Sequence, residues 1–125
     1  MNSERLPNHF VYRLIPPRPT FHLDMNEEEA GIMARHAEYW SGQMETGKVV
    51  AYGPVVDGTG SWGLAVFHAD SEDEARGVLA DDPAIATGMA TFELGTMPVA
   101  ILRATSEDPP RSMLGKEDPL EQRVG

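Results

Sequence analysis

The sequence predicts an α+β fold in which a four-stranded antiparallel sheet carries two helices on one of its faces. Three observations support this expectation. Segments of strand and helix character follow one another in the order β-α-β-β-α-β. Each helical segment begins with a capping-box pattern, Asn26-x-x-Glu29 or Ser71-x-x-Glu74. The 125 residues, 41% of them apolar, suffice for one packed core but would be crowded as two.

The first half of the chain is expected to contain one strand and one long helix. Residues 10–15 (FVYRLI) mix aromatic and aliphatic side chains, which is typical of a strand. Residues 16–24 (PPRPTFHLD) are expected to be an extended loop, because each proline fixes φ and disfavours helix in the residue before it. A helix is expected at residues 27–46, ended by Gly47, because apolar residues recur there at helical spacing. These apolar residues are Ala30, Met33, Ala37, Trp40 and Met44.

The second half is expected to contain a hairpin, a shorter helix and the last strand. Residues 48–56 and 61–69 have strand character and flank the turn sequence Asp-Gly-Thr-Gly, so they are expected to pair. The shorter helix is expected at about residues 71–81, where the proline that follows ends it. Residues 84–88 leave room for one more helical turn, and residues 89–102 are expected to form one strand or two.

The predicted domain covers residues 10–103, between a flexible N-terminus (residues 1–9) and a C-terminal tail (residues 104–125). The order of its elements is that of the ferredoxin-like fold. Two helices cover only one face of such a sheet, yet both faces of the predicted strands carry apolar side chains. We therefore expect a homodimer in which a second copy buries the other face, with the tail packing across or near the partner.

Composition excludes several classes of function. The net charge of −10 argues against nucleic acid and anionic membrane surfaces as partners. The absence of Cys excludes a disulfide scaffold, a thiol nucleophile and a Cys zinc site. No segment has the pattern of a signal peptide or a membrane span, so a cytoplasmic protein is expected.

Two kinds of residue are candidates for acid/base chemistry. His36 lies at the edge of the apolar stripe of the long helix, where an imidazole can reach a cleft. Asp81 and Asp82 end the shorter helix, where carboxylates oppose the helix dipole, and residues kept against a local preference sometimes serve a site. An Asp bonded to an imidazole N–H forms a general acid/base pair. Residue type alone favours the structural explanation, a locally bonded boundary histidine and solvated carboxylates, over the catalytic one.

Other side chains could bind a small-molecule substrate. Arg18 could bind an anionic group from its proline-held loop, or could simply be solvated. Three aromatic residues could line a pocket, although core packing explains the tryptophan equally well: Tyr39, Trp40 and Tyr52. His22 and Asp24 could supply two metal ligands, but no third is evident, so we expect neither a metal nor another cofactor.

An ordered set of short motifs resembles the YCII-related (YciI-like) family. The set comprises residues 35–40 (RHAEYW), 47–54 (GKVVAYGP), 62–66 (WGLAV), Ser71-x-x-Glu74-Ala75, and Asp82-Pro83 with Gly88. The resemblance covers about residues 10–103 and implies a ferredoxin-like domain that dimerises sheet to sheet as a dimeric α+β barrel.

The resemblance also implies roles for individual residues. The family has a histidine on the first helix and an aspartate before proline after the second, proposed as a catalytic pair, and these roles fall on His36 and Asp82. Asp81 has no counterpart in the motif. Ala84 stands where family members usually have an aromatic residue, which implies a wider pocket.

The leading functional hypothesis is a small cofactor-free lyase or isomerase, of dehydratase or dehydrochlorinase type, that acts on a cyclic or aromatic molecule. In this hypothesis His36 transfers the proton, Asp82 orients it, and an apolar pocket excludes water. Two alternatives are a non-catalytic module that binds a small molecule or a partner, and a cofactor-free monooxygenase of the dimeric α+β barrel type.

Overall fold

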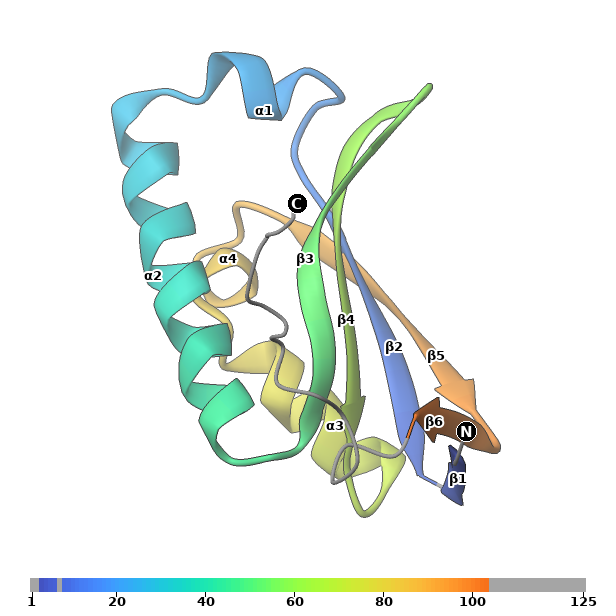
Figure 1. Ribbon diagram of the computed structural model, residues 1–125. Helices are drawn as coiled ribbons and strands as arrows, with labels where there is room; N and C mark the ends of the chain where they lie inside the picture. Colours follow the sequence, from blue (N-terminus) through green and yellow to red (C-terminus); the bar gives the residue numbers. More distant parts are fainter. Residues whose placement is uncertain (1–2, 7, 104–125) are drawn as a thin grey trace, which may run out of the picture. The chain divides into compact units, whose positions relative to one another are not determined.

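A computed structural model describes residues 3–6 and 8–103 of the chain. These residues fall into two units, which are described separately. Residues 8–99 form a four-stranded sheet with helices on one of its faces (Figure 1). The other unit pairs two short strands, β1 (Ser3–Leu6) and β6 (Ala100–Arg103), in antiparallel fashion. The predicted tail, residues 104–125, and its packing on a partner lie outside the described residues.

The four-stranded sheet has the order β3-β4-β2-β5, and all neighbouring strands are antiparallel. This order confirms the predicted ferredoxin-like α+β fold, including the hairpin of β3 and β4. In the central strand, Tyr12 lies opposite Ala65 of β4 and Leu94 of β5. The strands are β2 (His9–Ile15), β3 (Val49–Asp57), β4 (Gly60–His68) and β5 (Thr91–Met97).

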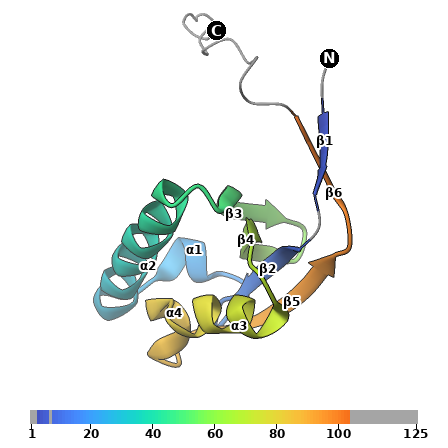
Figure 2. The ribbon, with the colours of Figure 1, turned by 90° about the horizontal axis from the view of Figure 1, so that it is seen from below.

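Four helices lie on one side of this sheet, as two views show (Figures 1 and 2). They are α1 (Phe21–Asp24), α2 (Glu27–Glu45), α3 (Glu72–Ala80) and α4 (Pro83–Ala86). The start of α2 is the predicted capping box: the Asn26 side chain accepts from the Glu29 N–H at 2.8 Å, and the Glu29 carboxylate accepts from the Asn26 N–H at 3.0 Å. Gly47 follows α2 with φ of 83°, a left-handed conformation that glycine adopts without strain.

The core of this unit lies between the helices and the inner face of the sheet. Trp40 of α2 is at its centre and is 1% exposed. Its ring stacks on Tyr12 with centroids 5.4 Å apart and meets the edge of Phe67 at 5.8 Å. None of the helices in the described part of the chain has the length and apolar composition that crossing a membrane requires.

The proline-rich segment differs from its prediction, because α1 is a helical turn and not extended loop. The last proline is Pro19, and a proline restricts only itself and the residue before it, so the chain is free to turn from Thr20 onward. The Leu23 N–H donates to the Thr20 carbonyl at 2.7 Å, and the Thr20 hydroxyl donates to the Asp24 carboxylate at 2.7 Å. These bonds close the turn.

The inward face of α2 is wider than the predicted stripe. Ile32 and Trp40 are buried and His36 is half-buried, whereas Ala30 is exposed. Ala37 also faces inward, because it lines the cavity between α2 and the sheet. His36 therefore belongs to the inward face of α2 and does not lie at its edge.

Three smaller predictions are corrected or sharpened by the structure. At α3, the Ser71 hydroxyl accepts from the Glu74 N–H at 3.1 Å, but the Glu74 carboxylate accepts from the Asp70 N–H, so only half of the capping box forms. The segment 89–102 contains two strands, β5 and most of β6. Residues 3–6, expected in a flexible terminus, form β1, which pairs with β6 and so satisfies backbone groups of both.

Candidate functional site

The site is built around Asp82, which lies between α3 and α4 and is 0% exposed. Its side chain caps α4, because Oδ1 accepts from the Ala84 N–H at 2.9 Å. Pro83 occupies the first turn of α4, where the missing N–H costs nothing. The expectation that Asp82 opposes the dipole of the preceding helix is therefore wrong: the carboxylate lies at the favourable, N-terminal end of the next helix.

Three side chains from other elements also donate to the buried carboxylate of Asp82. The Tyr12 hydroxyl donates to Oδ2 at 2.9 Å, from the central strand β2. The Trp40 indole Nε1 donates to the same oxygen at 2.8 Å, from α2. His36, one helical turn before Trp40, places Nδ1 2.9 Å from each of the two oxygens. The expected contact between His36 and Asp82 is thus present, and two strongly bonded aromatic side chains accompany it.

This arrangement keeps Asp82 ionised despite its burial. Burial alone would raise the pKa of Asp82, but the hydrogen bonds from His36, Trp40 and the Ala84 N–H outweigh it and hold that pKa below its usual range. The pKa of Tyr12 is raised, first by burial and then by the neighbouring Asp82 charge, so the phenol stays protonated and donates. An indole N–H and a backbone N–H can only donate, which also requires an accepting carboxylate.

The ionised carboxylate fixes the tautomer of His36. Because Asp82 can only accept, the Nδ1 that faces it must carry a hydrogen. In the neutral ring the lone pair is then on Nε2, and no bond to Nε2 is present within residues 8–103. The His36 side chain is 17% exposed. An imidazole held in this way can accept a proton at Nε2 while the carboxylate stabilises the resulting positive charge.

His36 lines a cavity of about 240 Å³ between α2 and the inner side of the sheet. Tyr12 and Trp40 line the same cavity, so all three side chains that donate to Asp82 lie between its carboxylate and the cavity. Apolar side chains contribute most of the remaining wall. The other lining residues are Leu14, Pro16, Phe21, Met33, Ala37, Tyr52, Gly53, Pro54, Ser61, Trp62, Gly63, Leu64 and Ala65.

The structure places two of the four expected substrate-binding residues at the cavity. Trp40 lines it and is fully buried, while Tyr52 lines it and is 37% exposed, with its hydroxyl 2.9 Å from Ser41 Oγ. Tyr39 is not among the lining residues: its hydroxyl donates to the Val78 carbonyl at 2.6 Å, which fastens α2 to α3.

Arg18 is not among the lining residues either, because carboxylates outside the cavity hold its guanidinium. It donates to both oxygens of Glu29, at 2.8 and 2.9 Å, and to the Asp24 side chain at 2.8 Å. A further bond reaches the Asp24 carbonyl at 2.9 Å. The same bonds occupy Asp24, which was paired with His22 as a candidate metal ligand. Among the described residues, no group of three or more His, Cys, Asp or Glu side chains could hold a metal ion.

Tyr12 belongs to this candidate site, although the sequence does not predict it. It alternates with Phe10 and Leu14 on the inner face of β2, a pattern that indicates core packing, and the sequence gives no sign that its hydroxyl reaches residue 82. Ala84 also differs from its expected role. It is 0% exposed and does not line the cavity, so its small side chain does not widen the space beside His36.

A protein-family model matches most of this chain. The model of the YCII-related domain matches residues 10–95, which span α2, the hairpin, α3, α4 and most of the sheet. No curated protein and no solved structure gives a significant match. Because the match covers more than half of the chain, this protein belongs to the YCII-related domain family.

Proposed function

We propose that this protein is a small cofactor-free enzyme, a lyase or isomerase that moves a proton on a cyclic or aromatic small molecule. The observation that carries the proposal is the buried, ionised Asp82, whose four donors include a histidine at an apolar cavity. A helix cap requires only the bond from the Ala84 N–H, whereas the carboxylate of Asp82 is 0% exposed and also accepts bonds from three side chains. Perturbed, buried groups of this kind cluster at functional sites.

In the proposed reaction, His36 is the general base and Asp82 is a positioning residue. Nε2 takes a proton from a carbon of the substrate, and the electron pair of that C–H bond forms a new double bond. In an elimination, the leaving group departs with the electron pair of its own bond to carbon, and the imidazolium gives the proton to that leaving group. In an isomerisation, the imidazolium returns the proton to another carbon of the substrate. Asp82 stabilises the imidazolium, and the apolar walls exclude water. General acid/base catalysis of this kind contributes about 10²–10⁴-fold.

The proposal is tested by isotope exchange, which needs no knowledge of the final product. A panel of cyclic ketones, lactones and halogenated or hydroxylated rings is incubated with the full chain in D₂O, and NMR detects deuterium at carbon. We expect the wild type to catalyse exchange on at least one class, and His36→Gln to abolish it with the fold intact. Exchange that is unchanged in His36→Gln contradicts the role of the base. A compound that binds at the cavity without exchanging or reacting favours the binding-module alternative.

We further propose that the protein is a homodimer formed through the outer face of the sheet. Alternation along β2 and β4 puts Val11, Ile15, Leu64 and Val66 on the face opposite the helices, and each is half-buried. An apolar sheet face of this kind is usually covered by another layer. Light scattering on the full chain is expected to give twice the mass of 13.7 kDa, and a monomer at micromolar concentration contradicts the proposal.

A further inference from the structure

We propose that the cavity beside His36 takes an uncharged ligand about the size of one substituted ring and rejects carboxylates. This inference rests on the proposed function, because it assumes that the cavity is the substrate site. It goes beyond that function by stating the charge and the size of the ligand. Three features of the described residues carry it: the lining contains no Lys or Arg, the carboxylate of Asp82 lies directly behind the wall, and the volume is small.

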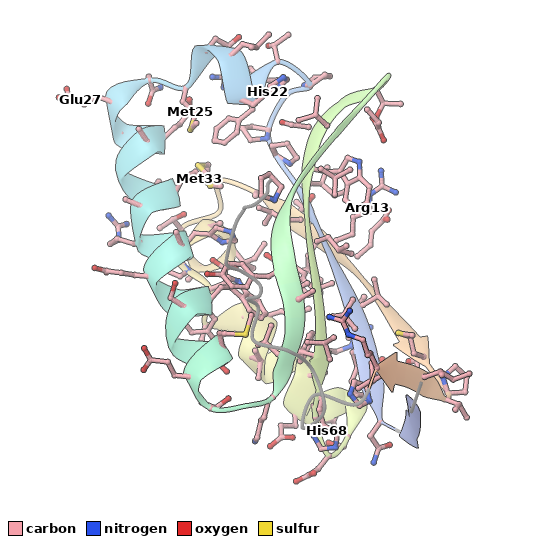
Figure 3. All side chains as sticks on the ribbon, viewed as in Figure 1. Arg13, His22, Met25, Glu27, Met33 and His68 are labelled. Atoms are coloured by element: carbon pink, nitrogen blue, oxygen red, sulfur yellow. The ribbon has the colours of Figure 1, made fainter. Side chains whose placement is uncertain are left out.

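The lining residues include no Lys or Arg within the described part of the chain. The two arginines nearest in sequence to the lining strand and loop are engaged elsewhere. Arg18 is bonded to Glu29 and Asp24. Arg13 lies on the other side of the sheet from α2, as Figure 3 shows, with its guanidinium 4.5 Å from the centre of the Trp62 ring. A ligand carboxylate would therefore have no counter-charge among these residues.

Asp82 makes the cavity still less favourable for an anion. Its carboxylate is bonded to Tyr12, Trp40 and His36, each of which lines the cavity. An anion that entered would lie near this charge, in apolar surroundings where an unpaired charge is costly. An uncharged ligand escapes this cost.

The volume suits a ligand of about one ring. An engineered apolar cavity of about 150 Å³ binds benzene in another protein. The space of about 240 Å³ beside His36 has room for such a ring with a few small substituents. The aromatic rings of Tyr12 and Trp40 line this space and make part of its wall apolar.

The test compares two probes with the same ring, 4-methylphenol and 4-methylbenzoate, on the full chain at about pH 7.5, where the carboxylic acid is ionised and the phenol is not. Binding is followed by the NMR signal of the Trp40 indole N–H, assigned by comparison with Trp62→Phe. We expect 4-methylphenol to shift this signal and 4-methylbenzoate to bind at least about tenfold more weakly. Equal or tighter binding of the carboxylate overturns the proposal, and so does failure of the phenol to bind at millimolar concentration.

A pair of matched variants tests the cause of the selectivity. Met33 lines the cavity from the face of α2 that looks toward the sheet (Figure 3). Met33→Lys should gain binding of 4-methylbenzoate, whereas Met33→Gln, of similar length and uncharged, should not. Equal carboxylate affinity in the two variants contradicts the electrostatic argument. His36→Gln separates this inference from the proposed function: it should lose isotope exchange and keep the preference for the uncharged probe.

Discussion

Tyr12→Phe removes one donor from Asp82 and leaves nearly everything else in place. The aromatic ring that stacks on Trp40 stays, and Oδ2 of Asp82 keeps its bonds from Trp40 and His36. The lost bond joins a hydroxyl to an ionised carboxylate at 2.9 Å, between side chains that are 1% and 0% exposed. Hydrogen bonds to charged groups contribute about 1.5–3 kcal/mol. We therefore expect the free energy of unfolding at pH 7 to fall by about 1.5–3 kcal/mol.

The loss in Tyr12→Phe should depend on pH, and the sign follows from Asp82. Its pKa is lower in the folded protein than in the unfolded chain, so ionisation of Asp82 contributes stability above the unfolded pKa of about 3.9. That contribution disappears as the pH falls through the folded pKa. The Tyr12 hydroxyl strengthens it, so wild type and Tyr12→Phe should converge in stability as the pH falls through the folded pKa of Asp82.

Urea unfolding followed by tryptophan fluorescence measures this effect at pH 7 and at acid pH. Tyr39→Phe is the matched control, because its hydroxyl donates to the neutral Val78 carbonyl at 2.6 Å. The control should lose about 0.5–1.5 kcal/mol, with little dependence on pH across the acid range. Equal stability of Tyr12→Phe and the wild type at pH 7, or a deficit that does not shrink as the pH is lowered, would contradict a bond from Tyr12 to an ionised Asp82.

Three further predictions concern the segment between β2 and α2 and its contacts. Arg18→Gln breaks the bonds to Glu29 and Asp24, so amide hydrogen exchange at residues 20–24 should accelerate. The exchange rate in Arg18→Lys should be intermediate. Unchanged exchange in Arg18→Gln would show that other contacts hold α1. The same ion pair lowers the pKa of Glu29 to about 2, so its contribution to stability should be lost as the pH falls from about 4.5 toward 2. Gly60→Ala should lower the free energy of unfolding by more than about 1 kcal/mol in chemical denaturation. The reason is that φ of Gly60 is 125° and a Cβ there would lie 2.5 Å from the Pro19 carbonyl oxygen. Gly58→Ala is the control, because a Cβ at Gly58 meets open space, and its loss of stability should be clearly different from that of Gly60→Ala.

The fold was predictable because each element has a local signal. Helix α2 is specified by the reciprocal cap of Asn26 and Glu29 and by the left-handed Gly47. The hairpin is specified by two β-rich segments around Asp57, whose side chain accepts from the Thr59 N–H in the turn. The helical turn after Pro19 is not predicted from the sequence, because the prolines before it disfavour helix. The turn depends on the side-chain bond from Thr20 to Asp24.

The candidate site was predictable only in part, because its key contacts join residues far apart in sequence. The pairing of His36 with Asp82 came from the family resemblance, since 46 positions separate them and no local pattern links them. Two predictions from residue type alone differ from the structure. Asp82 caps the next helix and does not oppose the dipole of the preceding one. Arg18 is held by two carboxylates and does not line the cavity. The hydroxyl of Tyr12 was missed because strand alternation reports only which face a residue occupies, not the partner of its polar end.

The proposed chemistry requires that Asp82 hold His36 with hydrogen on Nδ1 and leave Nε2 free to take a proton. Long-range ¹H–¹⁵N correlation spectra of the imidazole at about pH 9, above the usual range of histidine titration, distinguish the two neutral tautomers directly. We expect a protonated Nδ1 and an unprotonated Nε2 in His36, with the preference weakened in Asp82→Asn. A His36 ring that carries its hydrogen on Nε2 in the wild type would rule out this arrangement of the pair.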